Sequence, residues 1–167
     1  VMNVANLGAT STYTITGLVA ANKALTITTN ASNNDTVTIG TRVYTFKTTL
    51  TGAADEIKIG ASATATGDNM VSAIMATAGA GTNYGAGTVA NALVTAVNAA
   101  GVVTVTAIVS GASGNNIAIA EAGANLAWAG AATALSGGVL WIPLNQHGRK
   151  QNPADTRDAV RTYMMQE

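Results

Sequence analysis

The sequence predicts an α+β fold dominated by β-structure: an antiparallel β-sheet or sandwich with one packed amphipathic helix and a short C-terminal helix. Three observations lead to this prediction. Short runs of Thr, Val and Ile alternate with period two between segments rich in Asn and Gly, as half-buried strands do. One segment after Asp68 takes the period of a helix instead. A second candidate helix follows Asn152, near the end of the 167 residues.

The first half of the chain carries most of the alternating pattern. It predicts strands over residues 12–16, 24–28, 36–39, 42–47 and 56–59. Gly40 and Thr41 separate the third strand from the fourth, so these two are expected to form a β-hairpin. Within the fourth strand Tyr44 and Phe46 share one face, and Ile57 and Ile59 are expected to point inward from the fifth.

A helix is predicted in the middle of the chain. Asp68 can cap it through a side-chain oxygen. Val71, Ile74, Met75 and Ala78 follow at spacings i, i+3, i+4 and i+7, which places them on one stripe. Gly79 and Gly81 are expected to end the helix.

The second half of the chain returns to strands. Residues 93–97 and 102–109 flank the turn 98–101 and predict a second hairpin. Residues 111–116 form a polar turn. Further short strands are expected at 117–119, 126–128 and 139–142, and Pro143 ends the last one because it has no N–H to donate.

The tail predicts a short amphipathic helix. Asn152 can cap it, Pro153 suits its first position, and Val160, Tyr163 and Met164 lie with Thr156 on a narrow stripe. Two interpretations remain open. The helix packs on its own domain, or it is an arm that docks on a neighbouring subunit.

Composition divides the chain into three parts. An N-terminal strand pair or arm spans residues 1–30, the main β-rich module spans 31–137, and a C-terminal strand and helix extension spans 138–167. Asn30–Asp35 is expected to be the loop at the first boundary, since Asn and Asp favour turns.

Charge and cysteine content exclude several classes of protein. Eight Lys and Arg balance eight Asp and Glu, so the net charge is zero. Specific nucleic-acid binding is not expected, because it needs an excess of cations. No run of apolar residues is long enough to cross a membrane. The absence of Cys excludes disulfides, thiolate zinc sites and a Cys nucleophile.

The charges are few and unevenly placed. Only 10% of the residues are charged, against about 25% in an average protein. Residues 69–148 contain one charged side chain, Glu121, whereas residues 149–167 contain seven. Because a surface of such low charge favours self-association, we expect a subunit that packs against copies of itself. A monomer with a polar, uncharged surface is the alternative.

No pattern of catalytic residues is present, so we expect no enzyme, cofactor or metal. The single histidine, His147, has no partners at metal-ligand spacing. Ser113 lacks the spacing of a nucleophile elbow. Asp55 and Glu56 are adjacent and would point to opposite faces of a strand, so they cannot act as a facing acid–base pair. Asn33–Asp35 is the one candidate oxygen cluster for calcium, and it is interpreted as a plain turn.

The two tryptophans leave a binding function open. Trp128 and Trp141 could form a platform on which a sugar stacks, although such residues are more often anchors in a core or interface. The alternative function is therefore a secreted or surface β-domain that binds carbohydrate. The scarcity of aromatic residues (4%) argues against it, as does the lack of a charged and apolar leader in residues 1–4.

Several segments in the middle of the chain, taken in order, resemble a small β-rich module that recurs in virion proteins of tailed bacteriophages. A Thr/Val strand followed by Gly-x-x-Gly-Asn-x-Ile, at residues 103–118, is also similar to segments of phage tail sheath proteins. The segments that carry the resemblance are residues 35–46, 56–63, 68–74, 81–90 and 103–118.

The resemblance covers residues 35–137 and implies a structural role in the virion, without enzymatic activity and without site residues to transfer. We therefore expect a non-enzymatic phage protein that assembles as a homo-oligomer and with other structural proteins of the capsid or tail, as a decoration protein, a tail-tube subunit or another tail component.

Overall fold

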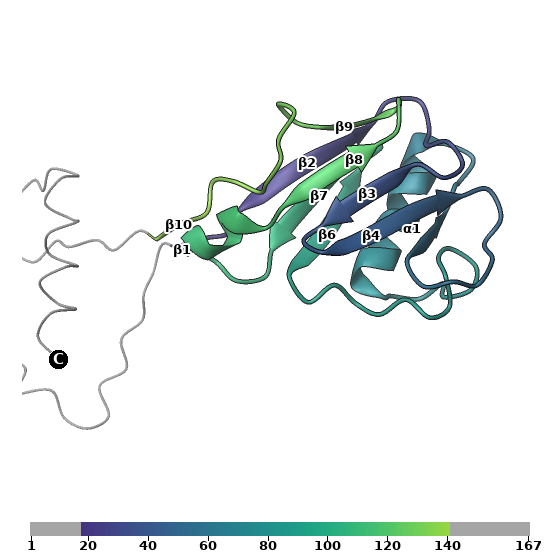
Figure 1. Ribbon diagram of the computed structural model, residues 1–167, viewed down its shortest axis with the longest axis horizontal. Helices are drawn as coiled ribbons and strands as arrows, with labels where there is room; N and C mark the ends of the chain where they lie inside the picture. Colours follow the sequence, from purple (N-terminus) through teal and green to yellow (C-terminus); the bar gives the residue numbers. More distant parts are fainter. Residues whose placement is uncertain (1–17, 141–167) are drawn as a thin grey trace, which may run out of the picture. The chain divides into compact units, whose positions relative to one another are not determined.

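The computed structural model describes residues 18–140, which are called the body below. The predicted strand at 12–16, the C-terminal helix, Trp141 and His147 lie outside the described residues. The body contains two four-stranded sheets, a two-stranded ribbon and one α-helix, so the β-dominated α+β prediction is confirmed for this part of the chain (Figure 1).

The first sheet has the strand order β6-β7-β2-β9 and is antiparallel throughout. Its strands are β2 (Asn22–Ile27), β6 (Val94–Ala99), β7 (Val102–Ala107) and β9 (Leu126–Trp128). In β7 the side chains of Val103, Val105 and Ala107 are buried, and those between them are partly exposed. This is the alternation that the sequence predicts.

The second sheet has the strand order β5-β4-β3-β8. Its strands are β3 (Thr36–Ile39), β4 (Arg42–Lys47), β5 (Glu56–Lys58) and β8 (Ile119–Ala122), and only β4 and β5 pair in parallel. Ile39 pairs with Arg42 across the two-residue turn that the sequence predicts. Tyr44 and Phe46 are both fully buried on the inner face.

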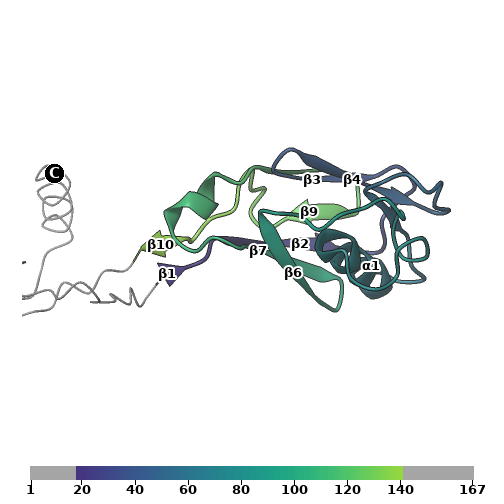
Figure 2. The same ribbon diagram turned by 90° about the horizontal axis from the view of Figure 1, so that it is seen from below.

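The two sheets form separate layers with the core between them. Figure 2 shows β3 and β4 in one layer and β2, β6 and β7 in the other. Residues from both layers make up a single cluster, which includes Leu25, Val37, Phe46 and Val105. A sandwich of this kind buries its alternating apolar positions without help from disulfides.

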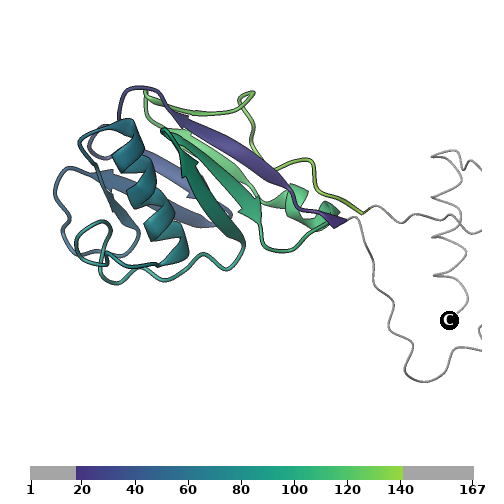
Figure 3. The same cartoon turned by 180° about the vertical axis from the view of Figure 1, so that it is seen from behind.

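Helix α1 (Ala63–Met75) covers one side of the sandwich. It contacts β5 of the second sheet and β6 of the first, and Figure 3 shows it running alongside β6. On the other side β8 contacts β9, and the segment after β9 links the sheets: Ile119 N–H of β8 donates to the Thr133 carbonyl, and Ser136 N–H donates to the Asn22 carbonyl of β2.

The ribbon lies at one tip of the body. It pairs β1 (Leu18–Val19) with β10 (Val139–Leu140), so the first and last described residues are neighbours. The 3-10 helix η2 (Ala112–Asn116) lies beside it, and Gly111 N–H donates to the Val19 carbonyl. The compact unit thus spans Leu18–Leu140 and extends on both sides beyond the 31–137 module expected from composition.

The helix begins earlier than the sequence predicts. Its N-cap is Ser62, whose hydroxyl accepts a hydrogen bond from Ala65 N–H at 3.1 Å, and Asp68 lies within the helix. It ends at Ala76, which takes a left-handed conformation with φ of 47°, so Ala78 lies outside it. The predicted stripe is also partly wrong, because Met75 is 38% exposed whereas Met70 is fully buried.

Two features of the second half differ from expectation in their boundaries. The β6–β7 turn comprises only Ala100 and Gly101, both with positive φ, as a tight type I′-like turn requires. The strand expected at 117–119 begins at Ile119 instead, because η2 occupies residues 112–116 before it.

Candidate interaction surface

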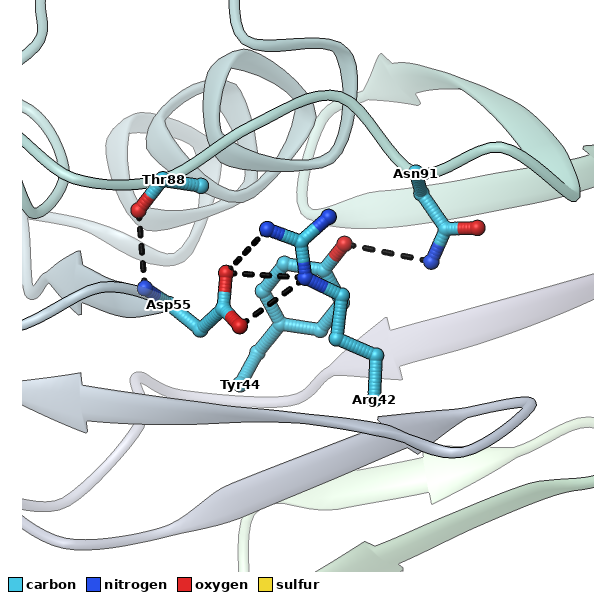
Figure 4. A network of polar contacts seen from close by, with 5 residues as sticks. All are labelled: Arg42, Tyr44, Asp55, Thr88 and Asn91. Carbon is cyan, nitrogen blue, oxygen red and sulfur yellow. Dashed lines mark hydrogen bonds and ion pairs between the residues drawn. The ribbon is translucent and has the colours of Figure 1, made fainter.

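A polar network joins the second sheet to the glycine-rich loop that follows α1 (Figure 4). Arg42, the first residue of β4, forms an ion pair with Asp55, just before β5. The Arg42 Nε lies 2.9 Å from both carboxylate oxygens of Asp55, and Nη2 donates to Oδ1 as well. Both side chains are largely buried, with 19% and 23% exposure. The pair is therefore a fixed structural contact.

Tyr44 lies beneath this ion pair. The Arg42 guanidinium is 5.3 Å from the centroid of the Tyr44 ring, within the range of a cation–π contact. The Tyr44 hydroxyl accepts a hydrogen bond from Asn91 Nδ2 at 3.2 Å, and Thr88 Oγ1 accepts one from Asp55 N–H at 2.8 Å. Asn91 and Thr88 belong to the loop, so the network ties that loop to β4 and β5.

Two members of the network, Arg42 and Tyr44, have a pKa raised above the ordinary value. The hydrogen bond to Asp55 raises the pKa of Arg42, and burial raises the pKa of Tyr44 although Asn91 opposes it. Both groups therefore keep their protons. A general acid or base needs a pKa near the working pH, and neither of these residues meets that condition.

Glu56 holds a loop. Its Oε1 accepts from the Thr51 hydroxyl at 2.7 Å, and Oε2 accepts from the N–H groups of Thr51 and Gly52 at 2.7 and 3.2 Å. These hydrogen bonds, chiefly that from the Thr51 side chain, lower the pKa of the Glu56 carboxyl. Asp55 and Glu56 thus have separate partners and do not face each other.

A shallow depression of about 500 Å³ adjoins the network. Arg42 and Asp55 line it together with the turn after β3 and the loop residues 87–93. Two of its lining residues, Val89 and Leu93, are 68% and 45% exposed. The depression therefore has an apolar rim and a neutralised ion pair in its wall.

A further exposed region lies at the ribbon end of the body. Six large hydrophobic side chains there are between 41% and 65% exposed, and we call this set the apolar end: Leu18, Val19, Leu93, Ile108, Val109 and Val139. Single exposed hydrophobic residues are ordinary, and only a contiguous group of them marks an interaction surface.

The candidate residues of the sequence fall in different places. Ser113 is exposed in η2. Trp128 is only 2% exposed, so it cannot present its ring to a sugar, and its Nε1 has no hydrogen-bond partner among the described residues. Within residues 18–140 no cluster of His, Asp and Glu could hold a metal ion.

The segment Asn33–Asp35 is a turn. Asn34 takes a φ of 73°, and its N–H donates to the Phe46 carbonyl. Asp35 Oδ2 accepts from Ser32 N–H at 2.7 Å, and Asn33 Oδ1 accepts from Thr48 N–H at 3.0 Å. These oxygens are thus engaged in closing the loop.

No helix among residues 18–140 has the length and hydropathy needed to span a membrane. Comparison with protein-family models, with curated proteins and with solved structures finds no match to this chain. The functional argument therefore depends on the sequence and the geometry of the body.

Proposed function

We propose that this chain is a non-enzymatic structural protein of a tailed-bacteriophage virion, which assembles with copies of itself and with other structural proteins of the capsid or tail. The observation that carries the proposal is the exposure of large hydrophobic side chains. In the body, ten of them are at least 38% exposed: Leu18, Val19, Val43, Met75, Val89, Leu93, Val97, Ile108, Val109 and Val139. Assembly would remove them from water.

The outer face of the β6-β7-β2-β9 sheet supports the same proposal. Strand pairing aligns its outward side chains in rows, and none of them is charged. The residues are Asn22, Ala24, Thr26, Thr95, Val97, Ala99, Val102, Thr104, Thr106 and Ala127. An uncharged face of this kind does not repel a neighbouring copy.

The chemistry of the polar groups also fits a structural role. Arg42, Tyr44, Asp55 and Glu56 are paired or hydrogen-bonded within the body, and the shifted pKa values of Arg42, Tyr44 and Glu56 all move away from neutrality. The resemblance of residues 35–137 to virion modules adds the phage context. The carbohydrate alternative loses Trp128 as a stacking residue, because that ring is buried.

Negative-stain electron microscopy of the purified chain, with a glycan array in parallel, tests the proposal. We expect regular particles: closed rings or tubes for a tail component, and small oligomers that bind expanded capsids for a decoration protein. Saturable glycan binding that disappears in Trp141→Ala, with no assembly at any concentration, would contradict the proposal and favour the carbohydrate alternative.

A further inference from the structure

The β5 edge of the second sheet is covered by a short stretch of the loop after α1. Lys58 N–H of β5 donates to the Asn83 carbonyl, and Gly85 N–H donates to the Glu56 carbonyl of β5, both at 2.9 Å. Residues 83–85 therefore take the place that a further strand would have beside β5, and we call them the edge cover.

The edge cover is anchored to the body on both sides of this contact. Tyr84 forms an antiparallel bridge with Ile57 of β5. The Tyr84 side chain is buried, and its hydroxyl donates to the Thr77 carbonyl. From α1, Asn69 Nδ2 donates to the Lys58 carbonyl at 2.8 Å. The outward backbone groups of β5 are thus satisfied within the same chain.

The close approach of the edge cover requires glycine at position 85. A Cβ on Gly85 would overlap the carbonyl oxygen of Ala53, a backbone atom that cannot turn aside. Gly87, two residues further on, is different, because the nearest neighbour of a Cβ there is the Ala54 side chain at 3.6 Å, an ordinary contact. A methyl group is therefore excluded at 85 and accommodated at 87.

Without its cover, β5 would be a ready template for another strand. An edge strand presents unpaired N–H and C=O groups with which a second chain can pair. The neighbouring strand β4 is rich in residues that favour strands, and Lys58 Nζ donates to the Thr48 carbonyl of its own chain. At the other edge of this sheet, Ile119 N–H of β8 donates to the Thr133 carbonyl, so that edge is also occupied from within the chain.

We infer that the edge cover is a built-in guard against strand addition: it occupies the edge of β5 on which a strand of a second copy would otherwise pair. The inference goes beyond the proposed function and does not depend on it, because it names a contact that copies of the chain are kept from making. Assembly, where it occurs, leaves the β5 edge unused.

Gly85→Ala in the full-length chain tests the inference, and Gly87→Ala is the matched control. The methyl group at 85 must push the edge cover away from the backbone at 53–54 and uncover β5, whereas the methyl group at 87 has room. We expect Gly85→Ala to gain thioflavin T fluorescence and larger species in sedimentation velocity, and Gly87→Ala to match the wild type. If folded Gly85→Ala behaves as Gly87→Ala does, the inference is overturned.

Hydrogen exchange shows whether the cover is in place and whether Gly85→Ala stays folded. In the wild type we expect Lys58 N–H to exchange at least about ten-fold more slowly than in an unstructured chain, because the Asn83 carbonyl accepts its hydrogen bond. In Gly85→Ala this protection should be lost, while the N–H of the fully buried Val105 stays protected. An unprotected Lys58 N–H in the wild type would overturn the inference, even if Gly85→Ala fails to fold.

Lys58→Pro in the Gly85→Ala background identifies the strand that pairs. Proline removes the outward N–H of β5, and an edge strand tolerates proline where that N–H does not bond to the neighbouring strand. We expect the double variant to return to the dye binding and sedimentation of Gly87→Ala, and unchanged association would overturn the inference. A monomeric wild type would contradict the proposed self-assembly but leave this comparison intact, so the two failures are distinguishable.

Discussion

At the residue scale, the Arg42–Asp55 ion pair is expected to stabilise the body. Both side chains are about four-fifths buried; beside them the backbone N–H of Asp55 donates to Thr88 of the loop after α1, and Asn91 of that loop donates to the Tyr44 hydroxyl. Removing one partner of a partly buried ion pair costs more stability than removing both. The remaining charge loses its counter-ion without regaining full hydration.

We therefore expect Arg42→Met to lower the free energy of unfolding by about 1–3 kcal/mol, less than the full cost at a completely buried site because about a fifth of the pair is exposed. Urea denaturation followed by circular dichroism measures the change. Lys47→Met is the control, since its exposed hydrogen bond to Asn34 should contribute less than about 0.5 kcal/mol. Equal losses in the two variants would contradict a stabilising role for the ion pair.

Glu56 gives the body a dependence on pH. Its pKa is lowered in the folded chain, so its hydrogen bonds stabilise the fold above the unfolded pKa, about 4.3, and this contribution is lost as the pH falls through the lower folded pKa. Glu56→Gln keeps the shape but not the charge. We expect it to lower stability at pH 7 by about 1–2 kcal/mol and to flatten the decline of stability below about pH 5.

Thermal melts from pH 7 down to pH 3 test this prediction. Asp68→Asn, at an exposed position on α1, controls for the general effect of removing one negative charge. If the melting temperatures of the wild type and of Glu56→Gln fall in parallel as the pH is lowered, other carboxylates govern the stability in acid.

At the element scale, α1 attaches to the sandwich through small and polar residues as well as apolar ones. Its buried positions are Thr66, Gly67, Met70, Ala73 and Ile74. The Thr66 hydroxyl donates to Asn30 Oδ1 at 2.6 Å and accepts from Gly60 N–H at 2.9 Å. Gly67 lies against the Asn98 side chain, so that a Cβ there would come within 2.6 Å of Asn98 Oδ1.

The orientation of α1 predicts opposite results at its two methionines. Met70→Asp should unfold the body, because it places a charge without a partner in the core, at a cost of several kcal/mol. Met75→Asp should shift the free energy of unfolding by less than about 1 kcal/mol, because Met75 is 38% exposed. Urea denaturation compares them, and a larger loss for Met75→Asp would mean that the helix is rotated from the orientation described.

The strands could be predicted from the sequence because their pattern is local. Alternation alone places Tyr44 and Phe46 on one face of β4 and Val43 on the other, and the structure buries the first face and exposes the second. The start of α1 could not be predicted from the sequence. Its first turns contain Ala, Thr and Gly, which give only a weak apolar periodicity, and nothing local distinguishes the N-cap Ser62 from the many other Ser and Thr residues of the chain.

The candidate surface could not be predicted, because it depends on long-range contacts. Arg42 and Asp55 are thirteen residues apart, and Asn91 lies 47 residues from Tyr44. The apolar end brings together residues from 18 to 139. No local spacing indicates such a cluster, although the stretch from 69 to 148, in which Glu121 is the one charged residue, indicates a surface of low charge.

At the scale of the whole molecule, the body differs between its two ends. The ribbon end carries the apolar end and both continuations of the chain. The other end carries polar loops. There the turn before β3, which contains Asn34 and Asp35, is hydrogen-bonded to the end of β4: Asn34 N–H donates to the Phe46 carbonyl, and Lys47 Nζ donates to Asn34 Oδ1.

The central claim is that copies of this chain associate. Multi-angle light scattering of the purified wild-type chain over a thousand-fold dilution series, about the range needed to see a micromolar equilibrium, tests it most directly. The account predicts a mass above 16.6 kDa that decreases on dilution, or a fixed multiple of that mass in a closed assembly. A constant mass of one chain at every concentration would contradict it.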